Sequence, residues 1–143
     1  MPRLLLLQND AANGEQLRRS IADMHEMTVS GLTVTLAQAL HSMQLCPPEL
    51  VLLDLQVRRS DREGLLEELA SRPRESRPAV LVGALSLEHP ALMEAISQGA
   101  DGYYLHGGSV QTLREAIEHV LAGESPMAPA IAGQAKSRFE SPA

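Results

Sequence analysis

The sequence has little of three things that often decide a protein's chemistry: cysteine, aromatic side chains and long apolar runs. Its 143 residues include one cysteine, one phenylalanine, two tyrosines and no tryptophan. The single Cys46 excludes an intrachain disulfide and the cysteine-rich zinc motifs, and it agrees with a reducing cytoplasm. No apolar run approaches the ~20 residues of a membrane span, and Leu4 to Leu7 is too short for a signal peptide. We therefore expect a cytoplasmic domain without membrane contact.

Positive charge is also scarce. The chain has 12 lysines and arginines but 18 acidic residues, which gives a formal net charge of −6. An acidic domain is poorly suited to bind nucleic acid alone, since that binding depends on neutralising phosphates. The sequence lacks the G-x-S-x-G, Walker and G-x-G-x-x-G motifs, and no two histidines have the i, i+4 spacing of a metal site. We expect neither nucleic-acid binding by this domain alone nor an enzyme.

Aliphatic residues are abundant, and they gather in five short segments. Apolar residues make up 44% of the chain. Apolar strands without alternation indicate burial on both faces, as in a parallel sheet covered by helices. The predicted strands are residues 4–7, 27–30, 51–55, 79–82 and 102–105, of which 27–30 has the weakest pattern.

Amphipathic helices are predicted between these strands and after the last one. Apolar residues recur there at spacings of three and four, which is typical of one buried helix face. Ser109 is a good N-cap for the last helix, Gly123 a good stop, and Pro47 with Pro48 ends the second helix. The residues that define the helices are Leu17, Ile21 and Met24; Leu36, Leu40 and Met43; Leu65, Leu66 and Leu69; Leu92, Ala95 and Ile96; and Leu113, Ile117, Val120 and Leu121.

Five strand–helix repeats predict an α/β fold with a doubly wound parallel sheet, strand order 2-1-3-4-5 and helices on both faces. In such folds ligands bind at the carboxyl ends of the strands, where the strand order reverses. Strands one and three flank that point, and the third ends at Asp54. Serine, proline and glycine dominate from Glu124 onward. We therefore assign 1–123 to one domain and 124–143 to a linker or tail, with a short helix near Ile131.

Three motifs in order resemble the receiver domains of bacterial two-component response regulators, which are flavodoxin-like (CheY-like) domains. They are Val-Leu-Leu-Asp-Leu at 51–55, Gly-Ala-Asp-Gly-Tyr-Tyr-Leu at 99–105 and Ala-Gly-Glu-Ser at 122–125. The second and third are most similar to receivers of the NarL/LuxR type, and the resemblance covers roughly residues 3–131. In that family a helix-turn-helix domain follows. The resemblance therefore implies that 124–143 leads toward a C-terminal DNA-binding domain that this sequence does not include.

The resemblance also assigns the residues of a phosphorylation site, and most of them are altered here. Asp54 matches the phosphoacceptor, and the two acids that normally hold Mg²⁺ are replaced by Gln8 and Asn9, unless a one-residue shift places Asp10 in the second position. Mg²⁺ needs near-octahedral oxygen ligands and usually one or two carboxylates. We therefore expect Asp54, Asp10 and Asn9 to form at most a weak Mg²⁺ site, with Gln8 in the same pocket.

The residues that sense a phosphoryl group in the family are changed as well. Ala84 stands where the family has threonine or serine, His106 where it has lysine, and Tyr103 matches the switch aromatic. Ala84 has no hydroxyl, and imidazole carries little positive charge at neutral pH. A ligand shifts a conformational equilibrium only through contacts that differ between the two states. We expect a weak response to phosphorylation. Alternatively, His106 is simply a polar residue at the end of a strand.

Three arginines follow Asp54 in a segment predicted as a loop: Arg58, Arg59 and Arg62. Arg58 is a candidate pocket residue. An arginine there could pair with Asp54 or hold an anion in the place of Mg²⁺. Alternatively, all three are solvated on an exposed face.

The resemblance implies signal transduction that controls transcription, with a histidine kinase or another signalling protein as partner. Our first hypothesis is an atypical receiver that acts through protein–protein contacts and homodimerisation. The alternative is a competent receiver, in which Asp54 takes a phosphoryl group from a histidine kinase. A third alternative, an enzyme or ligand-binding protein on a flavodoxin-like scaffold, is compatible with the fold but has no catalytic motif behind it.

Overall fold

The computed structural model describes residues 1–123, in which five strands alternate with five α-helices and a short 3₁₀ helix lies before the fourth strand. The elements are β1 (Arg3–Leu7), α1 (Ala11–Ala22), β2 (Thr28–Thr33), α2 (Leu36–Leu45), β3 (Leu50–Asp54), α3 (Arg59–Ala70), η1 (Arg74–Ser76), β4 (Ala79–Ala84), α4 (Pro90–Ser97), β5 (Gly102–Leu105) and α5 (Val110–Leu121). Every strand and helix predicted within residues 1–123 is present. The predicted tail and the helix near Ile131 lie outside the described residues.

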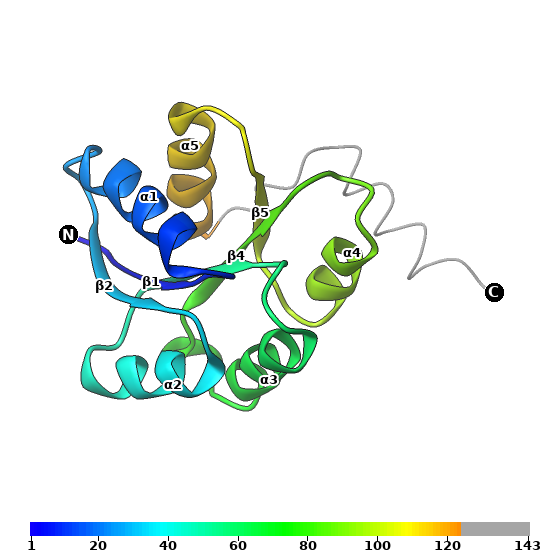
Figure 1. Cartoon of the computed structure of the whole chain (residues 1–143). Helices are drawn as coiled ribbons and strands as arrows, with labels where there is room; N and C mark the ends of the chain where they lie inside the picture. Colours follow the sequence, from blue (N-terminus) through cyan, green and yellow to red (C-terminus); the bar gives the residue numbers. More distant parts are fainter. Residues whose placement is uncertain (124–143) are drawn as a thin grey trace.

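The strands form one parallel sheet in the order β2-β1-β3-β4-β5, as predicted. Helices cover both faces (Figure 1): α1 and α5 pack on one, and α2, α3 and α4 on the other. The order reverses between β1 and β3, so the carboxyl ends of these two strands lie side by side. That edge is where doubly wound sheets bind ligands.

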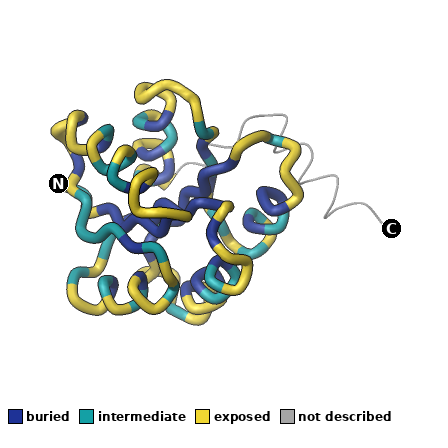
Figure 2. Tube along the Cα trace, viewed as in Figure 1, coloured by how far each residue is buried: buried dark blue, intermediate teal, exposed yellow. Residues whose placement is uncertain are grey.

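Burial follows the strand pattern. The residues Leu4–Leu7 and Leu50–Leu53 are completely buried, and Figure 2 shows the buried sheet running through the centre of the molecule. Because helices cover both faces, alternate residues of one strand enter different cores: Leu5 and Leu7 face α2, α3 and α4, whereas Leu4 and Leu6 face α1 and α5. Within residues 1–123, no helix has the length and apolar character to cross a membrane.

The predicted helix ends are confirmed with small shifts. The Ser109 hydroxyl accepts a hydrogen bond from the backbone N–H of Thr112 at 3.0 Å and so caps α5. Gly123 follows the end of α5 with a φ of 81°, a left-handed conformation that glycine adopts without strain. Helix α1 ends at Ala22, so Met24 lies beyond it, although its side chain is still buried.

Candidate functional site

The candidate site is centred on Asp54, the last residue of β3. Its side chain is only 1% exposed and lies at the carboxyl edge of the sheet. Oδ2 accepts a hydrogen bond from the backbone N–H of Asn9 at 3.3 Å, and Oδ1 accepts one from the backbone N–H of Gln56 at 2.9 Å. Nε2 of His106 lies 3.2 Å from the same Oδ1. Both oxygens of this buried carboxylate therefore have protein partners.

The residues after β1 are arranged differently from magnesium ligands. Gln8 is buried, and its Nε2 donates to the carbonyl oxygen of Leu52 at 3.2 Å. The Asp10 carboxylate is the N-cap of α1: Oδ1 accepts from the Asn13 backbone N–H at 2.8 Å, and Oδ2 from Asn13 Nδ2 at 2.9 Å. In residues 1–123, no three acidic, histidine or cysteine side chains gather closely enough to hold a metal ion.

His106 and Ala84 lie together at the ends of β5 and β4, as their sequence positions require. The backbone N–H of His106 donates to the Ala84 carbonyl at 2.9 Å, which turns the imidazole toward Asp54. The Ala84 side chain is buried and offers no hydroxyl group. A neutral imidazole can donate its Nε2 proton to the carboxylate, and a protonated one adds a positive charge. His106 is thus a direct partner of Asp54. The sequence predicted where His106 lies in the fold but not this contact.

The expectation that three arginines occupy the loop after Asp54 is wrong for two of them. Arg59 and Arg62 lie in α3, because that helix begins at once after Arg58. Arg62 is 5% exposed, so it is not solvated; its Nη1 donates to the carbonyl of Leu55 at 3.3 Å and its Nη2 lies 3.8 Å from Glu94. The exposed Arg58 has no ion pair with Asp54 in the described part of the chain. Arg59 and Arg62 both pair with Glu94 and so join α3 to α4.

Tyr104 is the site residue that the sequence analysis missed. The register of the sheet places Asp54, Gly83 and Tyr104 in one row across β3, β4 and β5, and neighbours in such a row point to the same face. The Tyr104 ring lies over Gly83, where an added Cβ would come within 2.6 Å of Cζ and the hydroxyl oxygen. The ring also meets His106 edge to face, with centroids 5.6 Å apart. No signal in the sequence marks this pairing, because it depends on the register between β4 and β5.

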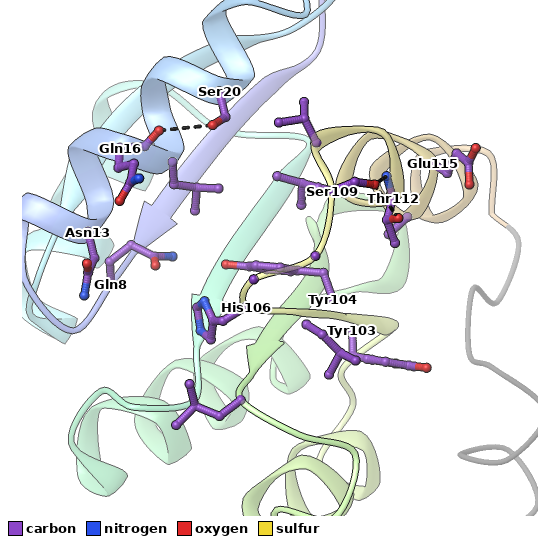
Figure 3. Close-up of a pocket in the computed structure, with 18 of the residues that line it drawn as sticks. Gln8, Asn13, Gln16, Ser20, Tyr103, Tyr104, His106, Ser109, Thr112 and Glu115 are labelled. Carbon is purple, nitrogen blue, oxygen red and sulfur yellow. Dashed lines mark hydrogen bonds between the residues drawn. The ribbon is translucent and has the colours of Figure 1, made fainter.

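The two adjacent tyrosines have opposite environments. Tyr103 is half-buried against the core on the side of α2, α3 and α4, and Figure 3 shows its hydroxyl pointing away from that of Tyr104. Tyr104 is 6% exposed, and its hydroxyl has no hydrogen-bond partner of normal geometry among the described residues. Burial raises the pKa of the Tyr104 phenol well above its usual value, and the negative charge of Asp54 raises it further, while the nearby Gln8 side chain lowers it.

The substitution Tyr104→Phe tests this environment. A phenol with a folded-state pKa above its unfolded value of ~10 contributes stability below that pH and loses it as the pH rises. Between pH 8 and 11 the wild type should therefore lose about 1 kcal/mol more stability than Tyr104→Phe. At pH 8 the variant should be at least as stable, because it removes an unsatisfied buried group. Urea unfolding at both pH values measures this, with Tyr103→Phe as the control. Parallel losses in all three proteins would contradict the assignment.

Among curated proteins, the chain is 27% identical over 114 residues to the uncharacterised transcriptional regulatory protein YvfU of Bacillus subtilis. The match covers 78% of this chain and 56% of that protein, so the chain spans little more than half of that relative. No family model matches the chain.

Solved structures agree on the fold. A LuxR-family two-component response regulator from Aurantimonas sp. SI85-9A1 superimposes with a TM-score of 0.76 and 19% identity, covering 99% of both chains. A LuxR-family DNA-binding response regulator from Staphylococcus aureus gives 0.73 and 17%, covering 85% of this chain and 99% of that one. ChrA, the response regulator of a heme-sensing two-component system, gives 0.72 and 22%, covering 99% and 67%. The chain therefore has the fold of a response-regulator receiver domain.

Proposed function

We propose that this chain is the receiver domain of a response regulator and that it works as an atypical receiver, through contacts with other proteins. The main support for this proposal is the set of contacts that the Asp54 carboxylate makes. Its Oδ1 is shared by Gln56 N–H and His106 Nε2, and its Oδ2 accepts from Asn9 N–H. Both oxygens of this carboxylate thus already have protein partners, and the side chain is only 1% exposed.

The residues near Asp54 do not fit a magnesium site. Asp54 is the one carboxylate at this point, since both oxygens of Asp10 are used in capping α1. The amide of Gln8 is turned to a backbone carbonyl, and neither Gln8 nor Asn9 carries negative charge. Transfer of a phosphoryl group to a carboxylate depends on positive charge to offset the repulsion between the two anions. Without a cation, that charge would have to come from His106, which contacts Asp54.

In this proposal the chain exchanges signals by binding: a histidine kinase or another signalling protein is the expected partner, and a second copy of the chain is the expected dimer partner. Control of transcription would belong to a DNA-binding domain elsewhere in the protein, as the name of the matched relative suggests. The scarcity of positive charge supports the view that this domain does not contact DNA alone. We propose no enzymatic role, and we place the domain in the cytoplasm.

Exposure to acetyl phosphate or beryllofluoride with Mg²⁺ tests the proposal against a competent receiver. We expect no mass gain with acetyl phosphate and no chemical-shift change around Asp54 with beryllofluoride. Sedimentation should give the same dimer fraction for the wild type and Asp54→Asn, with and without the phosphodonor. The asparagine keeps the shape and one acceptor oxygen of the side chain but removes the nucleophilic carboxylate.

Either of two results would overturn the proposal. A mass gain that disappears in Asp54→Asn would show that the carboxylate accepts a phosphoryl group. A dimer fraction that rises with the phosphodonor in the wild type alone would show that this phosphorylation controls assembly. The first result would leave the fold assignment intact and favour the competent receiver.

A further inference from the structure

A groove of about 650 Å³ lies at the amino edge of the sheet, opposite the edge that carries Asp54. It is lined by the C-terminal part of α3, residues 74–80, the turn between α4 and β5, and the end of α5. Its volume is within the range usual for binding sites. Its apolar surface includes the methyl groups of Ala70, Ala79 and Ala100, none of which is fully buried. Because alanine side chains are short, the groove has room for a longer apolar side chain.

The rim of this groove carries two arginines without an acidic partner. In the described part of the chain, neither Arg74 nor Arg77 forms an ion pair, and Nη2 of Arg77 donates instead to the Arg72 carbonyl at 3.0 Å. The one acidic residue of the lining is Asp101, whose Oδ2 accepts a hydrogen bond from the Val80 backbone N–H at 2.8 Å. Two positive charges therefore face one negative charge. The groove is complementary to a carboxylate that is attached to an apolar group.

The position of the groove favours a tethered carboxylate over a small free anion. Helices α3, α4 and α5 all end there. The C-terminal end of a helix carries a partial negative charge, which weakens the attraction between the arginines and a free anion. A carboxylate on a segment of the same chain needs little intrinsic affinity, because a short tether gives an effective concentration in the mM range.

The described part of the chain ends at the groove itself. Gly123 follows α5 with a φ of 81° and is one of the lining residues. The next residue is Glu124, and the first large apolar residues after it are Met127 and Ile131. Four residues span up to ~13 Å when they are extended. Met127 can therefore reach across the groove while the Glu124 carboxylate stays at its rim.

We propose that residues 124–131 of this chain dock in the groove, with the Met127 side chain against Ala79 and Ala100 and the Glu124 carboxylate beside Arg74. Methionine suits such a surface, because its unbranched side chain adapts to irregular gaps. Docking would fix the direction in which the chain leaves the domain, relative to the ends of α3, α4 and α5. The inference goes beyond the function proposed above and does not depend on it, because the groove and Asp54 lie at opposite edges of the sheet.

NMR spectroscopy of the full chain, with ¹³C-labelled methionine and alanine methyl groups, tests the docking directly. We expect nuclear Overhauser contacts between the Met127 ε-methyl group and the methyl groups of Ala79 and Ala100. Their relative intensity should not change on dilution, because the contact lies within one chain. The substitution Met127→Asp should remove the apolar contact and shift the Ala100 methyl signal toward its undocked position.

The contribution of charge is tested by Glu124→Arg, with Glu140→Arg as the matched control farther along the chain. Glu124→Arg should lower the ratio of docked to undocked molecules by about 2- to 5-fold, the value of one exposed ion pair. The Ala100 methyl shift, compared with that of the wild type and of Met127→Asp, measures this ratio. Adding Arg74→Glu to Glu124→Arg should restore the docking, and Glu140→Arg should leave it unchanged.

Four results would overturn the proposal. The first is the absence of any contact between residues 124–131 and the groove. The second is contact only between differently labelled copies in a mixed sample, which would make a second copy the occupant. The third is equally tight sulfate binding by the wild type and Met127→Asp, which would indicate a site for free anions. The fourth is an equal effect of Glu124→Arg and Glu140→Arg. None of these results bears on phosphorylation of Asp54, so the two proposals fail separately.

Discussion

The double variant Gln8→Glu, Asn9→Asp is expected to acquire a stability that depends on Mg²⁺, which the wild type should lack. The two substitutions add carboxylates at two residues near Asp54: Gln8, which is buried, and Asn9, whose backbone N–H donates to the Asp54 carboxylate. Without a cation, three neighbouring negative charges should lower the free energy of unfolding. The loss should be larger because residue 8 is buried, where a charged side chain loses its hydration. Bound Mg²⁺ would reverse the effect. At an excess of 100 times the dissociation constant, it should add about 2.7 kcal/mol to the free energy of unfolding.

Thermal unfolding with and without Mg²⁺ measures this difference. The control variant Gln16→Glu, Gln44→Glu adds the same two charges on exposed helix positions and should show no such dependence. If the wild type itself were stabilised by Mg²⁺ to the same extent, the amides would be adequate ligands and the atypical-receiver proposal would lose its basis. If the double variant folds but ignores Mg²⁺, the alignment of these two positions with the acidic pair is wrong.

The substitution Gly83→Ala should destabilise the domain by about 1–3 kcal/mol, although it adds a single methyl group. The new Cβ would lie 2.6 Å from Cζ and from the hydroxyl oxygen of Tyr104. The ring cannot move away easily, because it is buried between the sheet and α5. Gly83 also provides the carbonyl that accepts from Leu55 N–H at 2.9 Å, so a shift of β4 would disturb the residue next to Asp54.

A double-mutant cycle separates this contact from other effects of the methyl group. Tyr104→Leu removes the ring, so Gly83→Ala should cost much less in that background. The coupling free energy should be of order 1–2 kcal/mol, as is usual for residues in direct contact. Urea unfolding of the four proteins gives the value. A coupling near zero would mean that the glycine is required for the strand itself and not for the tyrosine.

Most of the fold could be predicted from the sequence because its signals are local. Unbroken apolar runs mark strands that are buried on both faces, and the spacing of leucines and isoleucines marks the helices between them. Both ends of α5 could be predicted from Ser109 and Gly123, because helix capping depends only on residues that are close in sequence. The alternation of strands and helices then leaves few allowed topologies, and the observed order is among them.

The site was predictable in position but not in contacts. Asp54 could be located because it ends an apolar strand, and His106 because it follows another. The 3.2 Å approach of these two side chains joins residues 52 apart in sequence. The burial of Arg62 was not predicted, because charged side chains are normally exposed. In the structure, the Leu55 carbonyl and the Glu94 carboxylate offset the cost of burying its guanidinium group.

By itself, the sequence determined the alternation of elements and the burial of the strands, and it supplied Gln8, Asn9, Ala84 and His106 at the strand ends around Asp54. Only the tertiary structure decided which groups occupy that space: His106 and two backbone N–H groups on Asp54, and the Tyr104 ring over Gly83. The physical reason is strand register. Residues that share a row across β3, β4 and β5 are distant along the chain, and continuous apolar strands give no sign of which residue faces which.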